Sequence, residues 1–309
     1  MKITVIGASG YVGSNVAFIL AIQGLADELV LIAPNRTNLV EHLAMDMATA
    51  ITDKKVIIRA GGYDDMKNSN IVIMCGGAPQ GLIKSRMEML DKNLPIIREV
   101  GQKVRELCPS AVVVTATNPV DPMNYAMYLA TGFDRHRLLG YSMNDTLRFR
   151  ALVAQTLGQV TRDVEGIAIG EHGESQVLLF SSVKVKGKPV KFDEATKIKI
   201  LAHIPEILRS FEELRTGRTS GITSAVGMRE IVDAIVNNTH SIVPSSAVLD
   251  GEYGCHHMSM GVPVQLGTGG IYKIVEAELA PDEEKQLETT LAILKPAMAV
   301  VDSFFSVKV

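Results

Sequence analysis

A histidine on a glycine-rich turn is the first candidate for chemistry. The segment IGEHGES (169–175) places His172 between Gly170 and Gly173, directly after the apolar stretch EGIAI. Glycine lets the backbone approach a ligand, and histidine has an ordinary pKa that allows proton exchange near neutral pH. The pattern predicts an acid/base histidine, with a structural histidine as the plainer alternative.

Asp145 and Arg148 are the charged partners expected near His172. They lie three positions apart in the predicted helix NDTLRF and therefore share one face. A carboxylate held against one ring nitrogen makes an imidazole more basic, which suits Asp145 to that role. Considered alone, the two residues are more typical of an ordinary helical ion pair.

A loop after the fourth predicted strand carries another cation. Residues 76–90 read GGAPQGLIKSRMEML, which include Arg86 and lead into a helix. Ligands bind at the carboxyl edge of a parallel sheet, where this loop must lie. Its composition suits a lid that closes over a substrate and expels water, although a long surface loop is the commoner case.

Three glycines precede the first predicted helix. Gly7, Gly10 and Gly13 form the pattern GASGYVG, a GxxGxxG spacing that is looser than GxGxxG. Without Cβ atoms the backbone can approach a pyrophosphate, whose charge then lies at the helix N-terminus. The alternative is a simple strand-to-helix turn.

The second predicted strand, ELVLIA, ends without the usual acid. The residues that follow are Pro34, Asn35, Arg36 and Thr37. An acid at this place accepts hydrogen bonds from the adenosine ribose and repels a 2′-phosphate, whereas Arg36 and Thr37 could hold that phosphate. We therefore expect NAD or NADP as cofactor, with NADP accepted. A solvated surface arginine is the alternative.

The elements that must position these residues alternate between strand and helix. Short apolar runs such as KITVIG, ELVLIA, NIVIMCG and AVVVTATN are separated by helical patterns, which predicts parallel strands buried on both faces. The expected fold is α/β, with a doubly wound parallel sheet (Rossmann) over residues 1–142 that binds the dinucleotide. An α+β catalytic domain follows over residues 143–309, with a turn at Gly187 and a C-terminal helix.

Composition excludes several classes of protein. The chain has 309 residues, 47% hydrophobic and 21% charged, with a formal charge of -3 and a pI near 6.2. This balance argues against nucleic acid as the main partner. No apolar run approaches the roughly 20 residues of a membrane span, and the N-terminus lacks a signal-peptide pattern. We expect a cytoplasmic protein without a membrane partner.

The cysteines suggest neither disulfides nor a metal site. Cys75, Cys108 and Cys255 lie far apart, so no disulfide framework or CxxC motif is indicated. Cys255, His256 and His257 are adjacent, but they fall where a hairpin turn belongs and no second ligand pair appears. No metal is expected.

The chain resembles the lactate/malate dehydrogenase family over nearly its whole length. The segments that carry this resemblance are GASGYVG, TNPVD, IGEHG, DGEYG and GVPVQLG. The chain looks most like the archaeal malate dehydrogenases of the lactate-dehydrogenase-like branch. The resemblance implies that His172 donates a proton to a keto oxygen, Asp145 orients His172, and Arg148 grips the substrate carboxylate. Arg86 would polarise the carbonyl. It also implies hydride transfer between NAD(P) and a small 2-keto or L-2-hydroxy acid.

Other site residues follow from the same resemblance. Asn118 matches an asparagine near nicotinamide and substrate, and Pro119 matches a proline that can be cis. Thr219 matches a wall of the substrate pocket and has an atypical neighbour in Arg218. The expected cofactor-binding residues are Gly7, Gly10, Tyr11, Val12, Gly13, Arg36, Asn93 and Asn118.

Gln80 makes the substrate ambiguous. At this position the family uses arginine for the second carboxylate of oxaloacetate and glutamine for the methyl of pyruvate. Gln80 favours lactate, while the overall resemblance favours malate, a substrate of the tricarboxylic acid cycle. Lys84 could replace the absent arginine, or could be a solvated lysine. Use of both substrates stays open.

Two other functions are alternatives. A catalytically silent cofactor-binding regulator would need none of Arg86, Asp145, Arg148 and His172. An NAD-dependent glycosidase-like enzyme would need a divalent metal. Family members usually form homodimers or homotetramers, and the helices SNVAFILAIQGL and SAVGMREIVDAIV could supply the interface.

Overall fold

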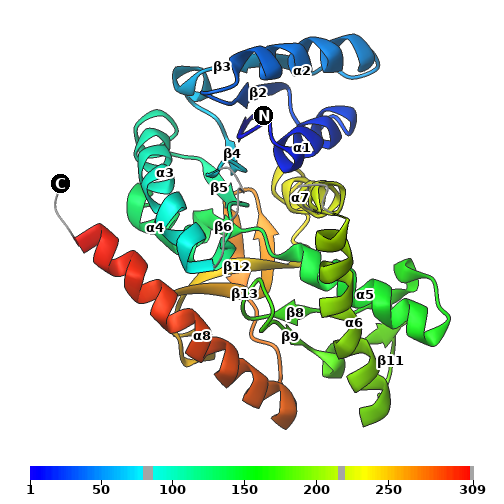
Figure 1. Ribbon diagram of the computed structural model, residues 1–309. Coiled ribbons are helices and arrows are strands. Elements are labelled where there is room, and N and C mark those ends of the chain that lie inside the picture. Colours follow the sequence, from blue (N-terminus) through cyan, green and yellow to red (C-terminus); the bar gives the residue numbers. More distant parts are fainter. Residues whose placement is uncertain (79–85, 215–219, 307–309) are drawn as a thin grey trace.

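The computed structural model describes residues 1–78, 86–214 and 220–306. Six parallel strands form one side of its main sheet, in the order β6-β5-β4-β1-β2-β3, with β3 at the sheet edge. Their residues are apolar and mostly buried because helices cover both faces, as Figure 1 shows. The doubly wound sheet predicted from the sequence is confirmed. The strands are β1 (Lys2–Ile6), β2 (Glu28–Ile32), β3 (Ile57–Gly61), β4 (Ile71–Met74), β5 (Val112–Thr115) and β6 (Leu138–Gly140).

Four helices connect these strands, and two more from the second half of the chain pack against them. In Figure 1, α3 and α4 lie together on one side of the sheet, and α1 packs beside the yellow α7 on the other. The C-terminal helix packs against α4, as expected for a closing helix. The helices are α1 (Tyr11–Ile22), α2 (Thr37–Ala50), α3 (Arg86–Leu107), α4 (Val120–Thr131), α7 (Gly221–Val236) and α8 (Pro281–Ser306).

The main sheet continues into the second half of the chain. β12 (Ile242–Asp250) runs antiparallel to β6, followed by β13 (His256–Gly267) and β14 (Gly270–Ile274). At the junction Gly140 lies opposite Ser246, and a Cβ at residue 140 would stand 2.6 Å from the Ser246 Cβ. Glycine therefore permits the close approach by which nine strands form one sheet.

A separate core lies under the remaining elements of the second half. Phe149, Phe180 and Phe192 pack edge to face there. The predicted turn at Gly187 is confirmed, since Lys186 and Gly187 both have positive φ between β10 and β11. The elements are α5 (Met143–Leu157), β7 (Val164–Glu165), β8 (Ala168–Ile169), β9 (Val177–Leu178), β10 (Lys184–Val185), β11 (Lys188–Pro189) and α6 (Glu194–Glu213).

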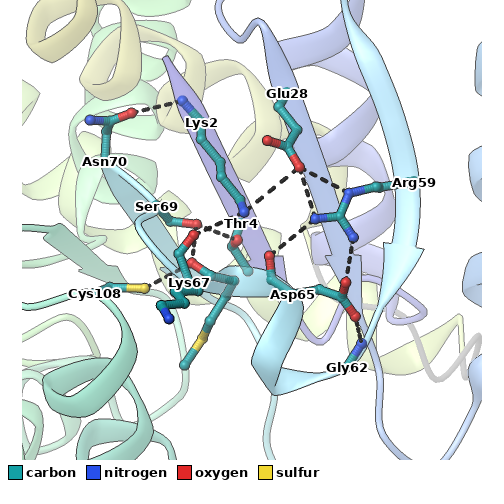
Figure 2. Close-up of polar contacts among 11 residues, drawn as sticks. Lys2, Thr4, Glu28, Arg59, Gly62, Asp65, Lys67, Ser69, Asn70 and Cys108 are labelled. Atoms are coloured by element: carbon teal, nitrogen blue, oxygen red, sulfur yellow. Dashed lines mark hydrogen bonds and ion pairs between the residues drawn. The ribbon is translucent and has the colours of Figure 1, made fainter.

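The amino edge of the parallel sheet carries a polar network, drawn in Figure 2. Arg59 pairs with Glu28 at 2.8 Å and with Asp65 at 2.6 Å, while the hydroxyls of Thr4 and Ser69 are 2.8 Å apart. The hydrogen-bonding groups of these side chains pair with one another, so the network at this edge has a structural role. The loops that carry the candidate site residues lie at the opposite, carboxyl edge.

All three cysteines are free, and Cys108 and Cys255 are buried. Across the described residues, none of the helices combines the length and apolar character needed to span a membrane.

Candidate active site

The glycine loop forms a cradle that side chains would fill. Gly7 has φ +84°, and a Cβ there would lie 2.4 Å from the backbone nitrogen of Gly76. A Cβ at Gly13 would lie 2.3 Å from the carbonyl oxygen of Gly7. Gly10 is the N-cap of α1 and, being glycine, offers no side chain of its own to cap that helix. The first-turn amides, at Tyr11, Val12 and Gly13, therefore suit an anionic ligand such as a pyrophosphate.

The end of β2 lies directly against this loop. The carbonyl of Ile32 accepts hydrogen bonds from the backbone N–H groups of Gly7 and Ala8, at 2.7 and 3.1 Å. Arg36 is exposed at the N-cap of α2, and the segment from Ala33 to Thr37 contains no acid. The groups present fit a dinucleotide and leave a cation beside the expected position of its adenosine ribose.

Asn93 joins the two loops that follow β4 and β5. Its Oδ1 accepts a hydrogen bond from the backbone N–H of Ala78 at 2.7 Å, and its Nδ2 donates to the carbonyl of Asn118 at 2.7 Å. The Asn118–Pro119 peptide bond is cis. The buried amide of Asn93 thus fixes backbone beside the expected nicotinamide position, an arrangement that the sequence alone did not suggest.

His172, Asp145 and Arg148 meet in space. The His172 Nδ1 lies 2.6 Å from the Asp145 Oδ2, and the Arg148 Nη1 lies 3.4 Å from the Asp145 Oδ1. Asp145 and Arg148 share one face of α5, while His172 comes from the turn after β8. With Nδ1 directed at a carboxylate, Nε2 is the atom available to exchange a proton with a ligand.

The environment makes His172 more basic. Burial lowers its pKa, but the charge of Asp145 and the hydrogen bond to it, together with the charge of Asp121, outweigh that effect. The net result is a pKa raised above the ordinary 6.5. The imidazolium is thereby stabilised, as a general acid near neutral pH requires.

Three elements hold the His172 turn. Gly170 exchanges backbone hydrogen bonds of 2.8 Å with Gly261 of β13, and Thr290 of α8 donates to the carbonyl of Ser175. The third contact comes from α4, where the Oδ2 of Asp121 accepts the backbone N–H of His172 at 2.7 Å. The imidazole is therefore carried on a fixed turn.

Two residues of this site were not singled out from the sequence. Asp121 stands inside the TNPVD motif, but an acid in the first turn of a helix is ordinary, so nothing marked it. Ser220 precedes α7, and its Oγ accepts a hydrogen bond from the Arg148 Nη2 at 2.9 Å. Its position next to Thr219 was the only available signal.

Several expected site residues lie outside the described part of the chain. These are Gln80, Lys84, Arg218 and Thr219. The backbone of Arg86 begins α3, but its side chain also falls outside the described residues. Their expected roles stay predictions.

The Cys255-His256-His257 segment follows a short helical turn at the tip of the β12–β13 hairpin. The His256 Nδ1 is 2.9 Å from the Asp250 Oδ1, which makes the pair an exposed ion pair when the imidazole is protonated. Within residues 1–78, 86–214 and 220–306, no three His, Cys, Asp or Glu side chains gather in a way that could bind a metal ion.

Comparison with family models covers both halves of this site. Residues 1–140 match the model described as lactate/malate dehydrogenase, NAD binding domain, and residues 144–305 match the alpha/beta C-terminal domain of the same family. The chain belongs to the lactate/malate dehydrogenase family. It is therefore an NAD-dependent oxidoreductase of the lactate/malate dehydrogenase type.

Similar proteins carry both names of the family. A malate dehydrogenase of Halobacterium salinarum is 33% identical over 93% of this chain and 95% of its own length. An L-lactate dehydrogenase 2 of Lactococcus lactis is 34% identical over 95% of this chain and 96% of its own length. Because the chain is about equally identical to both kinds of enzyme, sequence identity does not distinguish lactate from malate as the substrate.

Solved structures agree with the fold. A lactate dehydrogenase of Cryptosporidium parvum, complexed with lactic acid and nicotinamide adenine dinucleotide, has a TM-score of 0.89 and 29% identity over 97% of this chain and 98% of its own. A malate dehydrogenase of Salinibacter ruber has a TM-score of 0.88 and 30% identity over 98% of both chains. The predicted Rossmann-type sheet with a following α/β part is the arrangement of both.

Proposed function

We propose that this enzyme transfers a hydride between a nicotinamide cofactor and a small L-2-hydroxy acid, with His172 as the acid/base. The observation that carries this proposal is the 2.6 Å contact between the His172 Nδ1 and Asp145, with Arg148 on the other oxygen of that carboxylate. Residues 1–142 would hold the cofactor, and residues 143–309 would supply most groups that contact the substrate.

His172 and Asp145 manage the proton. In keto-acid reduction, protonated His172 donates from Nε2 to the keto oxygen as it becomes a hydroxyl. Asp145 fixes the ring orientation and stabilises the imidazolium before the transfer. When bound, the nicotinamide group supplies or accepts the hydride. The reverse direction requires neutral His172 to take the proton back.

Arg148 binds the carboxylate of the substrate. A planar guanidinium pairs with a carboxylate through two parallel hydrogen bonds, which fixes the reacting carbon as well as binding it. Asp145 and Ser220 already hold the two Nη atoms of Arg148. Arg86 is proposed to polarise the keto group from the segment after β4.

We propose that NADP is accepted alongside NAD. Support comes from Arg36 and from the missing acid after β2. The variant Arg36→Ala is expected to lower kcat/KM with NADPH by roughly 10-fold while leaving NADH little affected, because only NADPH carries a 2′-phosphate. Equal effects on both cofactors would contradict this role.

The substrate is proposed to be pyruvate/lactate, oxaloacetate/malate or both. Gln80 favours pyruvate because a neutral amide cannot pair with a second carboxylate. The halobacterial relatives named malate dehydrogenase support oxaloacetate, for which Lys84 or Arg218 would have to supply the missing cation. Lys84→Ala with undiminished oxaloacetate activity would remove Lys84 as that cation.

Steady-state kcat/KM for pyruvate and oxaloacetate, with NADH and NADPH, tests the proposal. His172→Gln is expected to lower kcat by roughly 10³-fold for every active substrate, since general acid catalysis contributes about 10²–10⁴-fold. His203, a partly exposed histidine on α6, gives the matched control His203→Gln, which should retain activity. No turnover of either keto acid by the unaltered enzyme would overturn the proposed reaction.

We further propose a homodimer or homotetramer in the cytoplasm, assembled in part through α1 and α7. These adjacent helices expose Phe18, Ile22, Ile222 and Val226, with exposed fractions of 37–63%. Such a patch costs free energy in water and favours burial against another copy. Phe18→Glu should reduce the mass measured by analytical ultracentrifugation; an unchanged mass would exclude this interface.

A further inference from the structure

Asp121 is a second carboxylate in contact with His172. Asp145 contacts the ring of His172, whereas the Asp121 Oδ2 accepts the backbone N–H of the same residue at 2.7 Å. The two acids come from different helices, α5 and α4. His172 therefore has two carboxylates beside it, and Asp145 is also paired with Arg148.

The surroundings of Asp121 are unusual for a carboxylate. The residue is 1% exposed, and its Oδ1 has no hydrogen-bond partner among the described residues. A buried oxygen without a donor raises the free energy of the ionised form. Accordingly, burial raises the pKa of Asp121 to about 6, although Ser246 and both the backbone N–H and the charge of His172 favour ionisation.

A buried polar cluster continues behind Asp121. Asn124, one turn along α4, donates from Nδ2 to the Ser259 Oγ at 3.0 Å, and the hydroxyls of Ser246 and Ser259 are 2.8 Å apart. The Asn124 Oδ1 is a second acceptor without a donor in the described part of the chain. Residues 121 and 124 share a helix face, and each has a buried side-chain oxygen without a donor among the described residues.

We propose that Asp121 is a positioning residue whose negative charge stabilises the protonated form of His172 and whose Oδ2 fixes the His172 turn. This inference rests on the proposed acid/base role of His172. Among the described residues, Asp145, Asp121 and Arg148 act electrostatically on His172, and His172 and Asp145 act on Asp121. Removing the charge of Asp121 while keeping its shape must therefore make the imidazole less basic.

The variant Asp121→Asn removes the negative charge of the side chain while keeping its shape. The amide oxygen can still accept the His172 N–H, and the new NH₂ group supplies a donor that the cluster lacks. In the folded state the carboxyl binds its proton more tightly than at the ordinary 3.8, so its ionisation opposes folding as pH rises through about 4 to 6. The variant should consequently melt a few degrees higher at pH 8 and show a smaller gain at pH 5.

The decisive measurement is an NMR titration of the histidine rings in the full chain, with the His172 signal assigned by its absence in His172→Gln. In Asp121→Asn the pKa of His172 should fall by roughly 0.5–1 unit. The matched control is Glu283→Gln. Glu283 is also a buried acid, 2% exposed, but its carboxylate accepts hydrogen bonds from Ser181 and from the backbone N–H of Ala280 rather than from His172. This control should leave the His172 titration unchanged.

Kinetics give the second readout. In Asp121→Asn, kcat for keto-acid reduction at pH 8 should fall by roughly 3- to 10-fold with little change in KM, because fewer His172 rings are protonated. An unchanged His172 pKa together with an unchanged kcat–pH profile would overturn the inference. A lowered pKa in a protein that reduces no keto acid would instead support the charge effect and reject the proposed function.

Discussion

The glycine loop and the His172 turn achieve binding by opposite means. In the loop the groups that would bind the ligand are backbone amides, and the positions require residues without a side chain. A Cβ at Gly13 would stand 2.3 Å from a carbonyl oxygen. On the turn the useful groups are side chains, and the backbone matters because β13, α8 and α4 hold it still. Substitutions in the glycine loop should therefore act through steric clashes, and substitutions around His172 should act through changes in charge.

The largest effect is expected where the electrostatic region loses its orienting anion. In Asp145→Asn, the amide can donate to the His172 Nδ1 and so favour the wrong tautomer. The kcat for keto-acid reduction should fall by roughly 10³- to 10⁴-fold, while cofactor affinity measured by fluorescence titration stays near that of the parent. A loss below 10-fold would mean that Asp145 is only an ion-pair partner of Arg148.

The steric region is tested by Gly13→Ala. The added methyl must displace the carbonyl of Gly7, so the cofactor Kd should rise by roughly 100-fold, as expected for a misplaced pyrophosphate cradle. Gly10→Ala is the matched control, since its Cβ would stand 3.3 Å from the same oxygen at an ordinary φ of -80°. Equal Kd values for the two variants would refute the steric explanation.

The raised pKa of His172 predicts opposite pH profiles for the two reaction directions. Because reduction needs the protonated ring, its kcat/KM should fall about tenfold per pH unit above the folded pKa, which exceeds 6.5. Oxidation should fall in the same way below that pKa. The stabilising contribution of the imidazolium is fully present below about pH 6.5 and is lost as pH rises through the folded pKa. Identical profiles for the two directions would exclude His172 as the proton carrier.

The smallest effect is expected at Ser220. Ser220→Ala removes one acceptor from the guanidinium of Arg148, so the arginine fork is less well oriented. The KM for the keto acid should rise about 3- to 5-fold with kcat little changed, because the lost contact supports binding before and during the reaction alike. A pure kcat effect would show that Ser220 acts on the chemical step.

The contrast between the two regions also explains what could be predicted from the sequence. The glycine spacing, the apolar strands and the order of helices each reflect local rules, so the parallel sheet was predictable. His172, Asp145 and Arg148 were predictable as candidates because their residue types suit acid/base chemistry and carboxylate binding. Their meeting in space depends on β8 and α5 lying side by side, which the structure supplies through the 2.9 Å bond from Ala168 N to the Thr146 hydroxyl.

Asp121, Ser220 and the dual contacts of Asn93 could not be read from the sequence. Each acts through partners 15 to 72 positions away, and each is an ordinary residue in its local setting. The extension of the parallel sheet by β12 was equally hidden, because pairing across Gly140 and Ser246 joins segments more than a hundred residues apart. Long-range contacts of this kind leave no periodic signal.

The junction at β6 also limits how far the two halves can be treated as modules. β6 pairs on one edge with β5 and on the other with β12, so cutting the chain near residue 142 would leave two open strand edges. Such fragments would carry complementary edges and a ready template for reassociation. If each fragment were fused to one of two interacting proteins, binding between those proteins would bring the two strand edges together. Recovery of the nine-stranded sheet would then report that interaction.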